Sequence, residues 1–431
     1  MKILVIGTGY VGSTTAMVFA ELGWKVTGLD TDVHKIRQLR QGLLHFHEPG
    51  LEDLLKKHIQ TGQIRFTTDK DRAIQESDVI FICVGTPSLP DGSADLLFVK
   101  QVASEIGQKM NGYKLVVTKS TVPVGTQELV KCWIEAAQEH FYPFDVASNP
   151  EFLREGKAVT DALNPDRIVI GSESKRATNL LKSLYHSAKC PFVITTPRTA
   201  ELIKYASNAF LATKISYINE LARLCDELNV NVKDVAGGIG LDPRIGSSFL
   251  QAGIGYGGSC FPKDVSALIL TARQNNIELS VLEKVVKVNQ TQHSYLTDKA
   301  RARLGSFSGK KIAILGLAFK PDTDDIREAP ALRIIESLLN ERAQLRLYDP
   351  IAILPNDAKY ESVAVCLEVE EALHEADAVF LCTEWPIIRG IDWAQMKHVM
   401  SHGNVFDGRN ILNAQDMQAM GYYYQSIGSN D

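Results

Sequence analysis

The chain has 431 residues, of which 45% are hydrophobic and 23% charged, and its formal net charge is -5. This length predicts two or three domains, and the composition excludes a chain dominated by disorder or low-complexity sequence. The small acidic charge excludes a global attraction to nucleic acid or to an acidic membrane surface, and no apolar run reaches the ~18 residues needed to span a bilayer. We therefore expect a small-molecule partner, with no nucleic acid and no membrane.

The seven cysteines bear on the compartment and on metal chemistry. They are odd in number and widely scattered, and the sequence has no CxxC pair of the kind that binds zinc or exchanges disulfides. Reduced thiols of this kind fit a reducing compartment. We therefore expect a cytoplasmic protein without a metal site.

The first thirty residues have the pattern of a strand, a helix and a second strand, with GxGxxG at Gly7, Gly9 and Gly12. A glycine-rich turn can merely pack a helix on a sheet, but Asp30 at the end of the second strand completes the context that dinucleotide binding requires. Asp30 would hydrogen-bond the adenosine ribose and repel a 2′-phosphate, which favours NAD over NADP. Lys35 either contacts the ribose end or is an ordinary surface lysine.

Further strands are expected within 78–87, 114–123 and 145–152, separated by helical segments. This alternation is typical of a parallel, doubly wound sheet. Thr86 and Thr121 follow two of these strands, where the ligand crevice of an open α/β sheet lies. Ordinary turn chemistry also accounts for them, and only the cofactor fingerprint upstream favours cofactor or water contacts.

The segment "SNPEFLREG" places Glu151 and Glu155 four residues apart. On a helix these like charges would repel each other unless each had a partner, and exposure on the surface is the simple alternative. The Asn-Pro pair before Glu151 favours a fixed turn over a helix.

A long helix is expected from Thr199 to about Leu228, followed by more helices to about residue 305. A helix of this length links domains or packs against a second subunit, and we expect a homodimer through it. Lys204 and Asn208 share one face, either as a snorkelling lysine and its neighbour or as donors to a developing oxyanion. The expected apolar stripe consists of Leu202, Ile203, Ala206, Phe210, Ile215, Ile218, Leu221, Leu224 and Leu228.

After Gly309 the sequence repeats the pattern of its first half. "KKIAILGLAFK" is similar to "MKILVIGTGYV", and "EADAVFLCTEWP" to "ESDVIFICVGTP". Asp349 ends a strand as Asp30 does, and Gly316 is kept, but the other two glycines are lost. We therefore predict two Rossmann-like α/β domains, 1–198 and 306–431, joined by a helical domain over 199–305, with a different ligand in the second.

The segment "GIGYGGSCFPKD" sets Cys260 after four glycines. A lone cysteine is most often a small buried hydrophobe. Pro262 indicates a helix start, however, and a thiol at a helix N-terminus beside Lys263 has reason to be more acidic than an ordinary one. Asp264 would share its face, and the glycines would leave room for a substrate to approach the sulfur.

Nine motifs occur in order along nearly the full chain: GTGYVG, VGTP, STVPVGT, SNPEFLREG, ELIKYASNAFLATKISYINE, LDPRIG, GIGYGGSCFPKD, LGLAFKPDTDDIREAP and DGRN. Together they closely resemble those of the UDP-glucose 6-dehydrogenases, within the UDP-glucose/GDP-mannose dehydrogenase family. The resemblance implies oxidation of the C6 alcohol of UDP-glucose to a carboxylate by two NAD in succession. It also implies that the first half binds NAD, the second binds UDP and the central helix forms a dimer.

The resemblance also implies the site residues. The catalytic residues would be Cys260 as nucleophile, Lys204, Asn208 and Asp264 around the reacting carbon, and Glu151 with Thr121 for water and protons. The cofactor would contact Gly7, Gly9, Tyr10, Val11, Gly12, Asp30, Lys35, Thr86, Thr121, Glu155, Lys263 and Arg327. The substrate would contact Glu151, Phe152, Leu153, Arg154, Lys204, Asn208, Phe249, Tyr256, Gly257, Cys260, Phe319, Lys320 and Arg409, together with the partner subunit's Arg244.

The implied chemistry explains the need for a thiol. Oxidation of the alcohol gives an aldehyde, which has no second hydride to transfer until a nucleophile adds to its carbon. The Cys260 thiolate would form a thiohemiacetal, and the thioester left after the second oxidation would be hydrolysed by water that Glu151 activates. Lys204 and Asn208 would stabilise the tetrahedral oxyanions.

Three alternatives stay open at this point. A relative acting on GDP-mannose or a UDP-N-acetylhexosamine would share these motifs, although acetamido-sugar relatives tend to carry histidine where this chain has Ser259. A one-hydride 3-hydroxyacid dehydrogenase would have no use for Cys260. A redox-sensing NAD or sugar-nucleotide binding module, without turnover, would share the pocket and the thiol.

Overall fold

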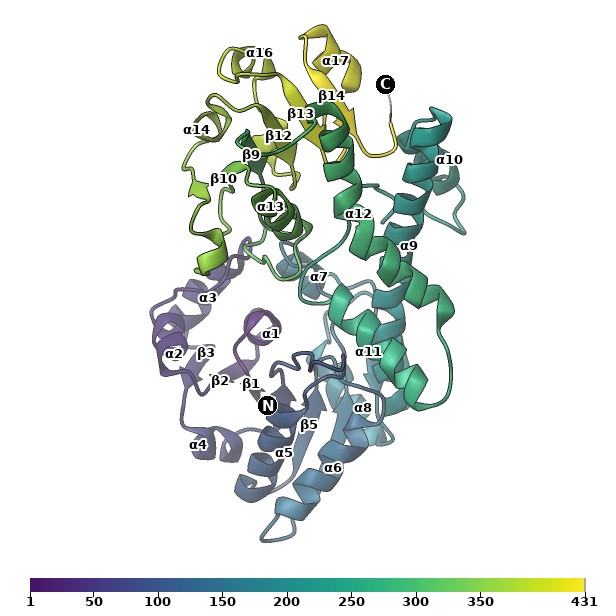
Figure 1. Ribbon diagram of the computed structural model, residues 1–431. Helices are drawn as coiled ribbons and strands as arrows, with labels where there is room; N and C mark the ends of the chain where they lie inside the picture. Colours follow the sequence, from purple (N-terminus) through teal and green to yellow (C-terminus); the bar gives the residue numbers. More distant parts are fainter. Residues whose placement is uncertain (430–431) are drawn as a thin grey trace. The chain divides into compact units, whose positions relative to one another are not determined.

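The computed structural model describes residues 1–429, which form two compact units. The N-terminal unit comprises residues 1–207 and 266–274, and the C-terminal unit comprises 208–265 and 275–429. Helices α9 (Pro197–Leu228) and α11 (Phe261–Gln274) each contribute residues to both units. Figure 1 shows the elements in chain order.

An eight-stranded sheet forms the centre of the N-terminal unit, in the order β3-β2-β1-β4-β5-β6-β7-β8. Neighbouring strands are parallel except for β6 and β7, which pair antiparallel. The strands are β1 (Lys2–Ile6), β2 (Lys25–Leu29), β3 (Ile64–Thr67), β4 (Val79–Ile82), β5 (Lys114–Thr118), β6 (Phe144–Ser148), β7 (Ile168–Gly171) and β8 (Phe192–Thr195). The helices are α1 (Tyr10–Glu21), α2 (Val33–Arg40), α3 (Leu51–Gln60), α4 (Lys70–Gln75), α5 (Leu97–Lys109), α6 (Thr126–Ala137), α7 (Ala158–Leu163) and α8 (Lys175–Leu184).

A six-stranded, all-parallel sheet forms the centre of the C-terminal unit, in the order β11-β10-β9-β12-β13-β14. The strands are β9 (Lys311–Leu315), β10 (Gln344–Tyr348), β11 (Ala364–Val365), β12 (Ala378–Leu381), β13 (Asn404–Asp407) and β14 (Tyr423–Ser426). The helices are α10 (Val232–Gly240), α12 (Ser280–Leu304), α13 (Pro330–Asn340), α14 (Val369–Leu373), α15 (Pro386–Arg389), α16 (Trp393–Met396) and α17 (Ala414–Ala419), with a 3₁₀ turn η1 (Ala358–Tyr360).

The repeat expected from the sequence is confirmed in the topology. Numbered from its own first strand, each sheet has the order 3-2-1-4-5-6, which is the doubly wound arrangement with its switch point beside the first strand. The N-terminal sheet continues with β7 and β8, which were not predicted from the sequence although both are short apolar runs, IVIG and FVIT.

The first turn is built alike in the two units. Gly7 and Gly316 both have left-handed backbones, at φ 90° and 97°, and a Cβ would meet Cys83 O at 2.8 Å or Thr383 Cβ at 2.4 Å. Only glycine therefore fits there. The carboxylates that follow the second strand of each sheet also accept a backbone N–H of the first turn. Asp30 Oδ2 accepts the Thr8 N–H at 2.8 Å, and Asp349 Oδ2 accepts the Leu317 N–H at 2.7 Å.

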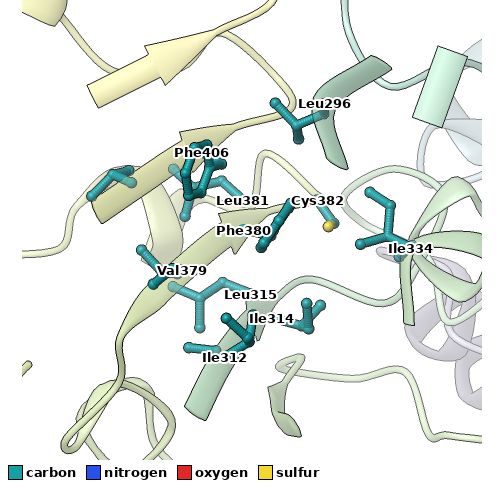
Figure 2. Close-up of a cluster of buried hydrophobic side chains, with 14 of the residues drawn as sticks. Leu296, Ile312, Ile314, Leu315, Ile334, Val379, Phe380, Leu381, Cys382 and Phe406 are labelled. Atoms are coloured by element: carbon teal, nitrogen blue, oxygen red, sulfur yellow. The ribbon is translucent and has the colours of Figure 1, made fainter. Parts of the chain in front are cut away.

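Apolar residues cover both faces of each parallel sheet. Along β1, Ile3 and Val5 join one buried cluster while Leu4 and Ile6 join another, because successive side chains of a strand point to opposite faces. In the C-terminal unit, Figure 2 shows side chains of β9, β12 and β13 packed with residues of the surrounding helices. The Phe380 and Phe406 rings lie 5.2 Å apart at the centre of this cluster.

The long central helix begins at Pro197 and ends at Leu228, close to the expected bounds, but the expected apolar stripe is not one buried face. Phe210, Tyr217, Leu224 and Leu228 are between 52% and 65% exposed. The buried positions carry mostly small or polar side chains, namely Ala200, Glu201, Lys204, Tyr205, Asn208, Ala209, Ala212, Ser216, Ile218, Asn219, Ala222, Cys225 and Asp226. The helix thus buries its polar groups and presents large apolar side chains outward.

Within residues 1–429, no helix combines the length and apolar character that a membrane crossing requires.

Replacing Phe406 by alanine should destabilise the C-terminal unit. The ring is fully buried against Phe380, and deletion of such a ring costs about 3–5 kcal/mol through lost burial and the cavity left behind. Phe141→Ala is the matched control, because Phe141 is 86% exposed and its loss should change stability by less than about 0.5 kcal/mol. Urea unfolding followed by fluorescence checks both. Equal midpoints for the two variants would contradict this assignment of the core.

Candidate active site

The turn between β1 and α1 has the shape that a dinucleotide phosphate needs. A Cβ on Gly12 would lie 1.8 Å from Gly7 O, so that this glycine lets the helix pack directly on the turn. A Cβ on Gly9 would meet no atom within 4 Å, which leaves open space beside the backbone. Tyr10 and Val11 then begin α1, whose first N–H groups favour negative charge. The glycines of this turn thus leave space beside the backbone and allow α1 to pack directly on the turn.

Asp30 is anchored at the end of β2. Its Oδ2 accepts the Thr8 N–H at 2.8 Å and the Thr8 hydroxyl at 2.9 Å, and Lys35 Nζ lies 3.3 Å away. Burial alone would raise the pKa of Asp30, but the N–H groups of Asp32 and Thr8 and the Lys35 charge hold that pKa below its ordinary value. The carboxylate therefore stays ionised at neutral pH. In this state it can accept hydrogen bonds from a ribose and repel a 2′-phosphate.

The two threonines after β4 and β5 meet in the structure. Thr86 Oγ1 donates to Thr121 O at 2.8 Å, and Thr86 is buried. Ser120 Oγ also donates to Val84 O at 2.7 Å, which ties the two strand ends together. The sequence analysis placed both threonines at one edge of the sheet, and this hydrogen bond brings them side by side.

A buried ion pair joins Glu151 to the central helix. Lys204 Nζ lies 2.8 Å from Glu151 Oε1, and the two side chains are only 4% and 6% exposed. Burial alone would raise the pKa of Glu151, but the Lys204 charge and hydrogen bond, the Leu153 N–H and the Lys119 charge hold it below its ordinary value. The Lys204 ammonium is therefore a buried donor to a carboxylate, rather than a snorkelling surface group.

The segment from Glu151 to Arg154 has no regular secondary structure, as the alternative of a fixed turn predicts. Leu153 N donates to Glu151 Oε2 at 2.6 Å. The Phe152 ring lies under the Arg167 guanidinium at 3.9 Å, with Lys204 Nζ 5.4 Å from its centre. Arg154 pairs through its guanidinium with Asp161 at 2.6 Å and is itself largely exposed.

In the C-terminal unit, Asn208 and Lys263 converge on one carboxylate. Asp264 is fully buried, and it accepts a hydrogen bond from Asn208 Nδ2 at 2.6 Å and from Lys263 Nζ at 2.6 Å. The acceptor fixes the Asn208 side chain, whose second amide hydrogen remains a potential donor. Asn208 and Asp264 thus belong to one network.

Cys260 directly precedes α11, and the Asp264 N–H donates to its carbonyl at 2.9 Å. The helix start predicted from "FPKD" is confirmed, with Pro262 in the first turn. The thiol is partly exposed, forms no disulfide and lies 3.4 Å from Ser259 Oγ. By contrast, burial raises the pKa of Cys83 and Cys382 to about 12, so these thiols stay protonated.

The glycines before Cys260 pack against protein atoms. A Cβ on Gly257 would lie 2.3 Å from Glu328 O, and one on Gly258 would lie 2.8 Å from the Phe319 ring. A Cβ on Gly255, whose φ is 108°, would lie 2.7 Å from Asn289 Oδ1. These glycines bring the segment before Cys260 into contact with the loop that follows β9.

Arg409 ties this region together. Its guanidinium donates to Cys382 O at 2.7 Å, Phe319 O at 2.9 Å and Gly255 O at 3.2 Å, and its side chain is 13% exposed. Lys320 Nζ lies 5.4 Å from the Phe319 ring centre. The structure therefore brings Cys260's segment close to Phe319 and Arg409.

The remaining expected contacts lie on exposed or strained positions. Arg327 and Arg244 are 64% and 88% exposed in their side chains and pair with the neighbouring Asp325 and Asp242. Phe249 has a left-handed backbone, at φ 65°, which is rare for a bulky residue. Its ring lies 6.2 Å from that of Phe261, and the Tyr256 ring lies 5.9 Å from Phe261 on another side.

Sequence reasoning missed two groups that hold these residues in place. Lys119 is buried and donates to Asn149 Oδ1 at 3.2 Å, while burial lowers its pKa. Asn289 accepts the Tyr256 N–H at 2.8 Å and donates to Tyr256 O at 3.0 Å. Lys119 directly precedes the motif "STVP" (120–123) at the end of an expected strand and could have been noticed there, whereas nothing in the local sequence marks Asn289.

Comparison with known proteins identifies the relatives. Residues 1–189 match the NAD binding domain of the UDP-glucose/GDP-mannose dehydrogenase family, residues 198–291 its central domain and residues 313–414 its UDP binding domain. The chain is 46% identical to the UDP-glucose 6-dehydrogenase TuaD of Bacillus subtilis (99% of this chain, 93% of that protein) and 44% identical to the UDP-glucose 6-dehydrogenase of Rhizobium meliloti (100% of both).

Solved structures agree with this result. A UDP-glucose dehydrogenase from Pyrobaculum islandicum superposes with a TM-score of 0.90 at 38% identity, covering 99% of this chain and 96% of the other. A UDP-D-ManNAc dehydrogenase from Pyrococcus horikoshii gives 0.89 at 30% identity and covers both chains fully. The α/β fold with two Rossmann-like sheets and a long central helix is therefore that of its relatives. The chain belongs to the UDP-glucose/GDP-mannose dehydrogenase family, with the NAD binding domain of that family at its N-terminus.

Proposed function

We propose that this chain is an NAD-dependent UDP-glucose 6-dehydrogenase, which converts UDP-glucose, two NAD+ and water to UDP-glucuronate and two NADH. Its full-length relatives at 39–46% identity bear that name. The observation that carries the proposal is the Cys260 thiol at the start of α11, beside the network of Asn208, Lys263 and Asp264. Only an oxidation that continues past the aldehyde needs such a nucleophile.

The proposed cofactor site lies in the N-terminal unit. The glycine turn would hold the pyrophosphate of NAD and Asp30 its adenosine ribose, with Lys35, Thr86 and Thr121 at neighbouring positions. Bound NAD supplies the acceptor for one hydride in each of the two oxidations. Glu155, Lys263 and Arg327 would complete its contacts.

The proposed chemistry divides between a nucleophile, oxyanion donors and a base. Cys260 Sγ would add to the C6 aldehyde, and Lys204 Nζ and Asn208 Nδ2 would donate to the oxygen that gains charge. After the second oxidation, Glu151 would accept a proton from the water that attacks the thioester carbon, which releases the thiol and the carboxylate. The lowered pKa of Glu151 keeps it ionised for this role.

The proposed substrate site lies around the segment before Cys260 in the C-terminal unit. Phe249, Tyr256, Gly257, Phe319, Lys320 and Arg409 would contact UDP-glucose there, with Phe152, Leu153 and Arg154 from the Glu151 segment. We propose three functional regions: an NAD-binding domain over 1–198, a central helical domain over 199–305 and a UDP-sugar domain over 306–431.

We also propose a homodimer through α9. Phe210, Tyr217 and Leu224 recur at intervals of seven residues and share a face with Leu228, and all four are at least half exposed. An exposed apolar face of this kind on a helix is typical of a contact with another chain. The exposed Arg244 would then be available to the site of the partner.

A panel of sugar nucleotides tests the function. UDP-glucose should yield two NADH per molecule at catalytic enzyme concentration, whereas GDP-mannose and UDP-N-acetylhexosamines should yield far less.

Cys260→Ala should reduce acid formation to about one hundredth or less of the wild-type rate, because the second oxidation loses its nucleophile. Cys132→Ala is the matched control, since Cys132 is exposed and is not among the proposed site residues. A yield of one NADH, or binding without turnover, would overturn the proposal.

Charge placed on the exposed face of α9 tests the dimer. The double variant Phe210→Lys, Leu224→Lys should sediment with the mass of one chain at micromolar concentration, because buried lysines across the contact would be unpaired. Phe141→Lys, at another exposed phenylalanine, should leave a wild-type dimer unchanged. Analytical ultracentrifugation distinguishes these outcomes. A wild-type monomer, or an intact dimer of the double variant, would be evidence against the proposed interface.

A further inference from the structure

Glu48 is a buried carboxylate that none of the steps above uses. It lies in the segment between α2 and α3, within "HFHEPG", and it is only 4% exposed. Glutamate is rarely buried so completely unless its oxygens have partners. Its surroundings therefore indicate a specific task within the N-terminal unit.

Three donors from two distant segments converge on this carboxylate. Gly156 N donates to Oε2 at 2.6 Å and Ala158 N to Oε1 at 2.7 Å. The Tyr10 hydroxyl also donates to Oε2. Both oxygens are thus engaged by N–H or O–H groups, and hydrogen bonds to an ionised acceptor are the strong ones.

The segments joined in this way both border the proposed cofactor site. Tyr10 is the first residue of α1 and directly follows Gly9, while Gly156 directly follows Glu155. Gly156 has a left-handed backbone, at φ 77°, so the chain turns sharply there. Burial raises the pKa of Tyr10, and the hydrogen bond to Glu48 and the charges of Glu48 and Glu155 raise it further.

The rest of the same segment is held at two other points. Glu151 accepts the Leu153 N–H and pairs with Lys204, and the Arg154 backbone and guanidinium both donate to Asp161. Glu48 supplies the third point, immediately after Glu155. Glu48 thus holds this segment on the side of Glu155 that lies opposite to Glu151 and Arg154 in sequence.

We propose that Glu48 is a positioning residue, whose carboxylate clamps the Gly156 and Ala158 amides to the start of α1 and thereby fixes Glu155 for the reaction. The proposal rests on the function proposed above for this site. It assigns to the "HEPG" segment the task of coupling the cofactor turn to the segment that carries Glu151 and Glu155.

The variant Glu48→Gln tests the clamp. Glutamine has the same shape, but its NH₂ group would face at least one of the three donors. Hydrogen exchange at Gly156 and Ala158 should become about tenfold faster or more, as expected from the loss of a hydrogen bond to a charged group, while exchange along β1 stays unchanged. The kcat with UDP-glucose should fall about tenfold or more, whereas the Kd for ADP-ribose, which contains every part of NAD except the nicotinamide, should stay within about twofold.

Glu52→Gln is the matched control, because Glu52 is an exposed glutamate four residues away and should behave as wild type in all three measurements. Unchanged exchange and unchanged kcat for Glu48→Gln would overturn the proposal, and so would a parallel loss of ADP-ribose binding with faster exchange along β1, which indicates a general structural role. Should this variant not fold, Glu48→Asp must show faster exchange at both amides and a lower kcat; wild-type values would overturn the proposal. Exchange and ADP-ribose binding need no turnover, so they decide on Glu48 even if the wild-type protein does not oxidise UDP-glucose.

Discussion

The buried ion pair between Glu151 and Lys204 is the constraint on which the rest of the N-terminal site depends. Two charges removed from water are tolerated only as a well-made pair, and the loss of either partner leaves an uncompensated buried charge. The pair therefore fixes an irregular segment of chain to α9, and it keeps Glu151 ionised despite its burial. The Leu153 N–H and the Lys119 charge stabilise the same carboxylate, and the Phe152 ring lies beside the Lys204 ammonium. The group that we propose as acceptor of a proton from water is thereby held in one place and in one ionisation state.

The central helix reverses the usual arrangement of a globular helix. Lys204, Asn208 and Asp226 lie on its buried face, while Phe210, Leu224 and Leu228 point outward. Burial of polar groups is costly unless they are hydrogen-bonded, and here Glu151, Asp264 and Lys299 supply the partners. The exposed apolar side chains then remain for a second chain, so that the same helix carries both the proposed chemistry and the proposed interface.

Local signals predicted the parts of the fold that depend on local geometry. The left-handed turn at Gly7, the acceptor at Asp30 and the helix start at Pro262 follow from backbone sterics and capping, which a few adjacent residues determine. Contacts between distant segments were not predictable in this way. The glycines before Cys260 were expected to leave room for a sugar, yet Gly257 and Gly258 pack against Glu328 and Phe319. The exposure of the apolar residues along α9 and the hydrogen bond from Gly156 N to Glu48 likewise depend on which segments meet. A single sequence does not contain that information.

Covalent capture of the substrate by Cys260 is the central claim, and trapping the acyl enzyme tests it most directly. Glu151→Gln should hydrolyse the thioester much more slowly than it forms it, because the base that activates water is lost. After reaction with UDP-glucose and NAD+ and an acid quench, mass spectrometry of the peptide that contains Cys260 should show the added mass of a UDP-glucuronyl group, with two NADH formed per site. An unmodified Cys260 peptide, in a sample that has produced those two NADH, would contradict the covalent mechanism.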